Sequence, residues 1–226
     1  MKYKGILLDI DNTLYDYNIS HNIAKNNVIE YCVRHFKRPQ SAIESAYKKA
    51  RGLVHIELSE TAASHNRLLY FQKMCEELNI NSLNNALTLY NIYWDSFLDN
   101  MKPFEGIYDF LKKYENAICL VTDLTAHIQY RKIEKLKLNT YCNKLVTSEE
   151  AGREKPHPYM FMLALKKLNL STNEVCMIGD NFKKDCIGAS NLGISSVWIN
   201  HENKQQAIEN PLIKEVASFK DILNIL

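Results

Sequence analysis

Residues 5–14 read GILLDIDNTL, and this stretch decides the fold. Gly5 to Ile10 is a short apolar run that ends in three polar residues, Asp9, Asp11 and Asn12. Because turn-forming residues bound it, the run predicts a buried strand with carboxylates just past its carboxyl end.

Similar short apolar runs recur in the second half of the chain, with amphipathic stretches between them. The runs lie at 117–121, 144–147, 175–178 and 196–199, and the amphipathic stretches at 125–136, 159–168 and 182–192. Strand alternating with helix predicts an α/β fold with a doubly wound, Rossmann-like parallel sheet. Residues 217–226 are expected to form a last amphipathic helix that closes this core.

The segment between the first two predicted strands has a different character. Gly52 is its only glycine, and its apolar residues recur at helical spacing, as at Phe71, Cys75 and Leu78. Helices are expected at about 20–37, 40–53, 61–79 and 83–99. The predicted domains are therefore an α/β catalytic core of residues 1–16 and 101–226 and a helical insert of residues 17–100.

Composition excludes several classes of protein. The 226 residues carry 28 Lys and Arg against 26 Asp and Glu, a net charge of +2, which argues against a nucleic-acid-binding protein. The six cysteines include no C-x-x-C pair, so neither a disulfide framework nor a structural zinc site is expected. No signal region or membrane-spanning run is apparent, so we expect a cytoplasmic protein that does not bind membranes.

Four groups of polar residues follow four different predicted strands. The groups are Asp9 to Leu14, Thr122 with Asp123, Lys155, and Gly179-Asp180 with Asp185. In open α/β sheets, ligands bind outside the carboxyl ends of the strands. Groups that are distant in sequence should therefore converge on one site.

Such a site combines four carboxylates, those of Asp9, Asp11, Asp180 and Asp185, with the ammonium of Lys155. Ionised carboxylates in a confined site repel one another, and a hard divalent cation with oxygen ligands removes that repulsion. Mg²⁺ is the expected cofactor, because it also neutralises charge on a phosphoryl oxygen. The Thr122 hydroxyl and Lys155 could stabilise a transferring phosphoryl group.

The four groups resemble, in order, the motifs of the haloacid dehalogenase superfamily, and the resemblance covers nearly the whole chain. The motif D-x-D-x-T-L appears as Asp9–Leu14, and G-D-x-x-x-x-D as Gly179–Asp185. The resemblance implies that Asp9 attacks phosphorus to form an aspartyl-phosphate and that Asp11 is the general acid and base. It also implies that Asp9, Asp180 and the Asp11 backbone carbonyl bind Mg²⁺. Asp185 would orient Lys155 or a metal-bound water.

The same resemblance suggests the reaction and the substrate class. Superfamily members that are dehalogenases or phosphonatases lack an acid two residues after the nucleophile, so Asp11 favours phosphate esters. The helical insert resembles the C1-type cap, and residues 122–126 with Gln129 resemble a branch of nucleotide and sugar-phosphate phosphatases. Thr122, Asp123 and Lys155 are then expected to contact substrate, although several relatives carry Asn where this chain has Asp123.

Two other functions remain open from the sequence: a sugar-phosphate phosphomutase and a non-catalytic binding protein on the same scaffold. The main hypothesis is a phosphatase for a small phosphorylated metabolite, either a nucleoside monophosphate or a sugar phosphate. Four basic residues flank the predicted centre of the helical insert, where substrate selectivity is expected. Exposed positions on helices would explain these basic residues equally well. The four residues are Arg51, His55, His65 and Arg67.

Overall fold

The computed structural model describes residues 3–226, so residues 1 and 2 of the predicted core lie outside its described part. The chain divides into two compact units. One comprises Met1–Asp16 with Lys102–Leu226, and the other comprises Tyr17–Met101. The boundaries expected from the sequence were 16/17 and 100/101.

The first unit is built on a parallel sheet, which has six strands in the described part of the chain. Its order is β3-β2-β1-β4-β5-β6, and every neighbouring pair is parallel. The strands are β1 (Gly5–Leu8), β2 (Ile118–Thr122), β3 (Lys144–Thr147), β4 (Val175–Gly179), β5 (Ser195–Ile199) and β6 (Ile213–Val216). The α/β fold with a doubly wound parallel sheet is thereby confirmed.

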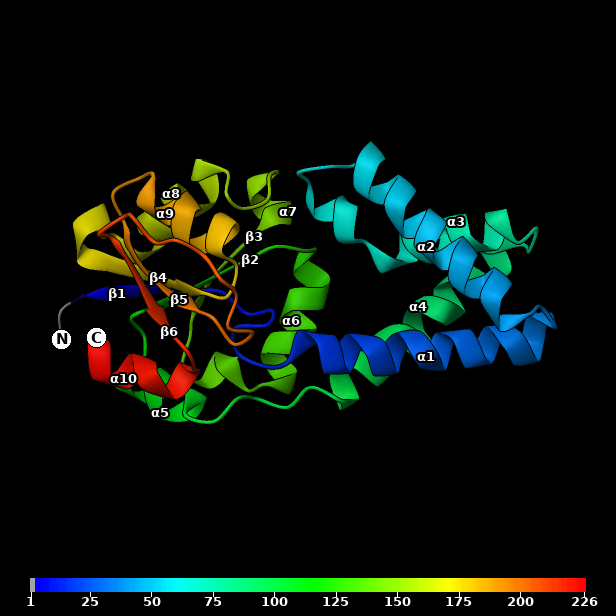
Figure 1. The fold of residues 1–226 in the computed structure, drawn as a ribbon, viewed down its shortest axis with the longest axis horizontal. Coiled ribbons are helices and arrows are strands. Elements are labelled where there is room, and N and C mark those ends of the chain that lie inside the picture. Colours follow the sequence, from blue (N-terminus) through cyan, green and yellow to red (C-terminus); the bar gives the residue numbers. More distant parts are fainter. Residues whose placement is uncertain (1–2) are drawn as a thin grey trace. The chain divides into compact units, whose positions relative to one another are not determined.

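Helices cover both faces of this sheet. In Figure 1, α8 (Pro158–Leu168) and α9 (Gly188–Ser190) lie above the strands, and α5 (Ile107–Lys113) and α10 (Ile222–Ile225) lie below them. Every residue of β1, β2 and β4 is buried, as expected for strands covered on both faces. The remaining helices of the unit are α6 (Ala126–Lys135) and α7 (Ser148–Ala151), with short helical turns at Leu138–Thr140, Thr172–Glu174, Phe182–Ile187 and Phe219–Asp221.

The structure differs from the sequence-based prediction at the end of the chain. The edge strand β6, Ile-Lys-Glu-Val, was not predicted, because its two middle residues are charged and exposed. The predicted last helix over 217–226 is instead one short turn followed by the four-residue α10. Among the residues of these two elements whose burial is described, Phe219 and Ile222 are the buried ones, so little apolar surface is available to stabilise a longer helix.

The second unit consists of α1 (Tyr17–Phe36), α2 (Gln40–Glu57), α3 (Arg67–Glu77) and α4 (Ser82–Asp99). Helix α4 buries Leu89, Tyr93 and Phe97 at helical spacing, and it packs against both α1 and α3. The helix predicted over 61–79 is broken, with a short turn at Ala62–His65 before α3. The break occurs where the Asn66 side chain caps α3 by accepting a hydrogen bond from the Leu68 amide at 2.9 Å.

The strand order indicates which edge of the sheet is expected to bind a ligand. β1 is central, and the chain leaves it first towards β2 and β3 and later towards β4, β5 and β6. The carboxyl ends of β1 and β4 therefore border the crevice at which open α/β sheets bind ligands. Among the described residues, no helix is long and apolar enough to cross a membrane. All six cysteines are free and buried.

Candidate active site

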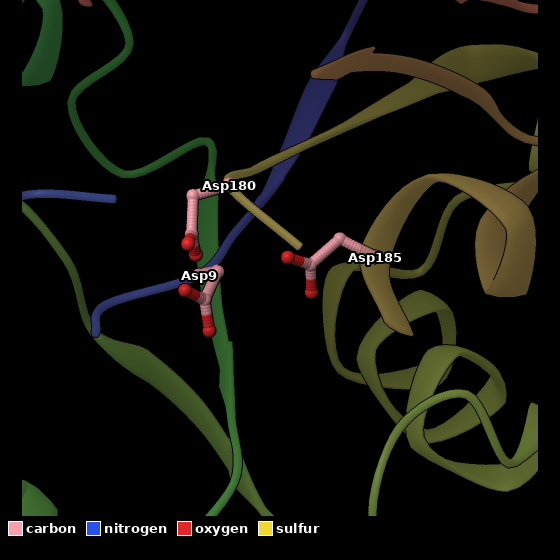
Figure 2. Close-up of side chains that lie close together, drawn as sticks. All are labelled: Asp9, Asp180 and Asp185. Carbon is pink, nitrogen blue, oxygen red and sulfur yellow. The ribbon is translucent and has the colours of Figure 1, made fainter. Parts of the chain in front are cut away.

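The predicted site residues come from loops that follow adjacent strands. Asp9 directly follows β1, Thr122 ends β2, and Asp180 directly follows β4. Figure 2 shows the side chains of Asp9, Asp180 and Asp185 close together. The parallel register that pairs Leu8 with both Leu120 and Ile178 brings these loops to the same edge of the sheet.

Asp9 is buried, with 5% of its surface exposed, and both of its carboxylate oxygens have partners. Oδ1 accepts a hydrogen bond from Lys155 Nζ at 2.6 Å, and Oδ2 accepts one from the Thr13 hydroxyl at 2.8 Å. The pKa of Asp9 is raised to about 7, first by burial and then by the charges of Asp185 and Asp11, against the opposing effect of Lys155. The carboxylate is thus oriented, and added positive charge would favour its ionised form.

Lys155 is the central cation of the site. Its ammonium group donates to Asp9 Oδ1 at 2.6 Å, to Asp185 Oδ1 at 2.7 Å and to the Val121 carbonyl at 3.0 Å. These three bonds use all of its donors. Burial alone would lower the pKa of Lys155, but the carboxylates of Asp185 and Asp9 raise it well above its usual value, so the ammonium stays charged.

Asp180 is tied to the loop that carries Asp9. Its Oδ2 accepts a hydrogen bond from the Asn12 side-chain amide at 2.9 Å, and its Oδ1 lies 3.3 Å from the Thr13 hydroxyl. Burial and the neighbouring Asp9 charge together raise the pKa of Asp180 to about 6, against the opposing effects of Asn12, Lys155 and Thr13. The Thr13 hydroxyl has a single proton and lies closer to Asp9 Oδ2, at 2.8 Å, and its oxygen accepts from the Asp180 backbone N–H at 3.0 Å. Thr13 therefore links the loops that carry Asp9 and Asp180.

Asp185 approaches the backbone of the G-D motif closely. Its Oδ2 accepts a hydrogen bond from the Asn181 backbone N–H at 3.0 Å. A Cβ atom at position 179 would lie only 2.2 Å from Asp185 Oδ2, so only glycine fits at this position. Burial raises the pKa of Asp185, while Lys155 opposes that effect.

The donor set at this site fits a hard divalent cation. Asp9, Asp180 and Asp185 each offer a carboxylate oxygen, and these three oxygens lie within 4.8 Å of one another. Oxygen donors are the ligands that Mg²⁺ prefers, and burial, followed by the charges of neighbouring carboxylates, raises the pKa values of Asp9 and Asp180. The residues present are therefore suited to Mg²⁺.

The Asp11 side chain engages a different set of groups. Lys132 Nζ donates to both of its oxygens, at 2.5 and 2.7 Å, and Gln129 donates to Oδ2 at 3.1 Å. The Tyr15 hydroxyl donates to Oδ1. Burial by itself would raise the pKa of Asp11, but the charge and hydrogen bonds of Lys132 lower it below its usual value, with help from Tyr15 and Gln129.

Thr122 and Asp123 lie beside these groups and are held by other side chains. Gln129 donates to the Thr122 hydroxyl at 2.9 Å. Asp123 Oδ1 accepts from the Lys155 backbone amide at 3.0 Å, and Oδ2 accepts from Lys184 Nζ at 2.7 Å. Each carboxylate oxygen of Asp123 thus accepts a hydrogen bond from a lysine.

The sequence-based prediction did not assign Lys132 or Lys184 to the site. Lys132 is fully buried on the face of α6 that also carries Gln129 and Ile133. Its signal in the sequence was a lysine in phase with the apolar residues of an amphipathic helix. Lys184 bonds Asp123 and Glu154 at 2.7 and 2.9 Å, and its position in the sequence carries no comparable signal.

Comparison with known proteins places the chain in a family. Residues 6–199 match the family model described as haloacid dehalogenase-like hydrolase. The chain is 32% identical over 212 residues to ribulose-1,5-bisphosphate 5-phosphatase of Halopiger xanaduensis, a match that covers 91% of this chain and 88% of that protein. It is 25% identical over 213 residues to the pyrimidine 5'-nucleotidase YjjG of Escherichia coli, covering 91% and 90% of the two chains.

A solved structure shows the same fold. The crystal structure of a HAD phosphatase from Thermococcus onnurineus superposes with a TM-score of 0.77 at 17% identity, covering 98% of this chain and 97% of that one. The strand order, the clustered carboxylates with their lysine and the match over most of the length agree with one another. The chain therefore belongs to the haloacid dehalogenase-like hydrolases.

Proposed function

We propose that this protein is a Mg²⁺-dependent phosphatase that hydrolyses a small phosphorylated metabolite through an aspartyl-phosphate on Asp9. One observation carries the proposal: Asp9 is buried at the end of the central strand, oriented by Lys155 and Thr13, beside the carboxylate of Asp180. A carboxylate held in this way is a competent nucleophile towards phosphorus.

The reaction proceeds in two displacements. In the first, an oxygen of Asp9 bonds to phosphorus, the bond from phosphorus to the leaving oxygen breaks, and Asp11 gives that oxygen a proton. In the second, water attacks the same phosphorus and Asp11 takes a proton from the water. The bond from phosphorus to the Asp9 oxygen breaks, which releases phosphate and restores the Asp9 carboxylate. Lys132 favours the ionised state of Asp11, which the second displacement requires, so the first displacement proceeds from the less populated protonated form of Asp11.

Positive charge and donors surround the position of the transferring group. Lys155 keeps its charge next to Asp9, and the Thr122 hydroxyl lies at the neighbouring strand end. Asp9, Asp180 and the Asp11 carbonyl would hold Mg²⁺, which when bound supplies charge that offsets the carboxylates and a phosphoryl oxygen. Asp185 and Asp123 act as positioning residues, through the ammonium and the backbone amide of Lys155 respectively.

The relatives suggest the substrate class. One is named for a sugar bisphosphate and the other for pyrimidine nucleotides, so both act on small phosphorylated metabolites. We extend this class to the present chain, with sugar phosphates first because the ribulose-1,5-bisphosphate 5-phosphatase has the higher identity.

Replacement of the nucleophile tests the proposal. Asp9→Asn should abolish phosphate release from p-nitrophenyl phosphate in the presence of Mg²⁺. Asp11→Asn should slow the second displacement, so intact-mass spectrometry should detect protein that carries one phosphoryl group. Asp109→Asn is the matched control, since it removes the same charge from an exposed position in α5 of the same unit.

Two outcomes would contradict the proposal. If Asp9→Asn keeps wild-type turnover, Asp9 is not the nucleophile. If a panel of sugar phosphates is isomerised without release of phosphate, the protein is a phosphomutase instead.

A further inference from the structure

Helix α6 carries a buried lysine that contacts the loop after β1. Lys132 has no exposed surface, and it lies on the face of α6 that also buries Gln129 and Ile133. Its Nζ donates to both carboxylate oxygens of Asp11, to Oδ1 at 2.5 Å and to Oδ2 at 2.7 Å. Both residues belong to the α/β unit. The ammonium thus holds the carboxylate to which the proposed function assigns proton transfer.

Stability alone does not account for a lysine at this position. Burying an ammonium costs free energy, and its attraction to a carboxylate often does not recover that cost. Well-packed apolar residues commonly replace a buried ion pair without loss of stability. The other buried neighbours on this helix include Ile128 and Ile133, so a leucine or methionine would continue the pattern. The presence of a lysine therefore points to a role in the site.

The Asp11 side chain is accessible, whereas Lys132 is not. The exposed fraction of the side chain is 23% for Asp11 and 0% for Lys132. A small molecule at the carboxyl ends of the strands can therefore contact Asp11 but not Lys132. Lys132 can act on the reaction through Asp11, but not by binding the substrate itself.

Gln129 contacts the same carboxylate from the preceding turn of α6. Its side-chain nitrogen lies 3.1 Å from Asp11 Oδ2, 2.9 Å from the Thr122 hydroxyl and 2.7 Å from the Asp123 carbonyl. The carboxylate and the carbonyl can only accept, so the amide must turn its nitrogen towards them. The amide has two protons for three acceptors, and its contact with Asp11 is the longest. Asp11 Oδ2 is therefore the oxygen with a lone pair left for proton transfer.

The other oxygen of Asp11 is held more completely. Oδ1 accepts from Lys132 Nζ at 2.5 Å and also from the Tyr15 hydroxyl. Lys132 is the charged donor of this set, whereas Tyr15 and Gln129 are neutral. Hydrogen bonds from a charged donor to a carboxylate are about twice as strong as those between neutral groups. Loss of the Lys132 ammonium should therefore loosen the Asp11 carboxylate more than loss of either neutral donor.

We propose that Lys132 is a positioning residue for Asp11, which anchors Oδ1 and so leaves Oδ2 oriented for proton transfer in both displacements. The inference rests on the proposed phosphatase function, in which Asp11 protonates the leaving oxygen and then takes a proton from water. Proton transfer needs a separation of about 2.6–3.2 Å between the two heavy atoms. Misplacement of a reacting group by about 1 Å can cost about a hundredfold in rate, so a carboxylate free to rotate would be a poor acid and base.

Rapid-quench kinetics with p-nitrophenyl phosphate and Mg²⁺ tests this role. Nitrophenolate leaves with little help from an acid, so the first displacement should survive in Lys132→Met. The second displacement needs Asp11 to take a proton from water, so kcat should fall about 10- to 100-fold. Each protein molecule should then release one nitrophenolate in a rapid burst and accumulate one phosphoryl group, which intact-mass spectrometry detects. Because kcat/KM reports the first displacement, it should stay within about threefold of the wild-type value.

Three further variants separate positioning from a general loss of structure. Lys132→Gln keeps a donor without the charge, so it should show the same burst with a smaller fall in kcat, even if Lys132→Met does not fold. In the Asp11→Asn background, Lys132→Met should change kcat by less than about twofold, because the group that it positions is already gone. Lys135→Met removes an exposed lysine from the same helix and should leave kcat and the burst unchanged.

The proposal is overturned if Lys132→Met keeps the wild-type kcat. It is also overturned if the burst shrinks in proportion to kcat, since loss of folded protein would then explain the effect. The same conclusion follows if Lys132→Met slows Asp11→Asn by as large a factor as it slows the wild-type protein. Absence of phosphate release by the wild-type protein would instead overturn the phosphatase function together with this inference, without any change at Lys132.

Discussion

The two units each bury a cation, and they satisfy it in opposite ways. In the α/β unit, Lys155 is held by the carboxylates of Asp9 and Asp185 at 2.6 and 2.7 Å. In the helical unit, Arg67 contacts a tyrosine hydroxyl, a backbone carbonyl and aromatic rings, with no carboxylate partner in the described residues. The α/β unit thus pairs its buried ammonium with carboxylates, whereas the helical unit surrounds its buried guanidinium with neutral oxygens and aromatic rings.

The largest effect is expected from Lys155→Met. Its removal leaves two buried carboxylates without their shared partner, which should destabilise the protein by about 3–5 kcal/mol and abolish phosphate release. Urea unfolding of the α/β unit and a phosphate-release assay measure both effects. Adding Asp185→Asn to the variant should restore part of the stability, and a double variant no more stable than the single one would contradict this account.

A smaller effect is expected from Arg67→Met, although this cation is equally buried. No carboxylate is left unpaired by the change, so the loss should be about 1–2 kcal/mol, from two hydrogen bonds and the cation–π contacts. The same urea titration measures it. If Arg67→Met lowers the free energy of unfolding as much as Lys155→Met does, the proposed difference between the two units is wrong.

The metal dependence of stability should vary with pH. The folded pKa values of Asp9, about 7, and Asp180, about 6, lie above the ordinary value of 3.8. The folded state therefore holds more protons than the unfolded state in this range, and the metal-free protein should lose stability as pH rises from about 4 to about 7. Mg²⁺ favours the ionised carboxylates, so adding Mg²⁺ should raise the free energy of unfolding more above about pH 7 than between about pH 4 and pH 7.

Thermal unfolding with Mg²⁺ or with a chelator checks this expectation. The rise in Tm on adding Mg²⁺ should be larger at about pH 7.5 than at about pH 5.5, by roughly 2–4 °C for each kcal/mol of difference. Asp180→Asn should reduce the pH dependence, because it removes one of the two titrating groups. An equal rise in Tm at both pH values would show that Mg²⁺ binding is not linked to these carboxylates.

The smallest effect on stability is expected from Tyr47→Phe. The hydroxyl is buried without a partner in the described residues, so its removal should leave the free energy of unfolding unchanged or raise it by no more than about 1 kcal/mol. Thermal unfolding measures this change. A clear loss of stability would show that the hydroxyl is already satisfied in the free protein.

Local sequence determined much of the fold and the positions of the acidic residues. Short apolar runs bounded by turn-forming residues predicted the strands that became β1 to β5, and Asp9 and Asp180 directly follow two of them. Because parallel strands end at one edge of the sheet, their convergence could be inferred without coordinates. The edge strand β6 was missed because only its first and last residues are buried.

The sequence placed Lys155 beside the acidic residues, but only the tertiary structure showed that Lys132 and Lys184 also pair with carboxylates. Lys132 pairs with Asp11 across 121 residues and Lys184 with Asp123 across 61, distances in sequence at which no local pattern operates. The same holds for the contact between Arg67 of α3 and the Tyr93 ring of α4, whereas Tyr70 lies one turn away from Arg67 in the same helix. Backbone periodicity is a local property that a sequence displays, whereas the partner of a buried charge depends on how separate elements pack together.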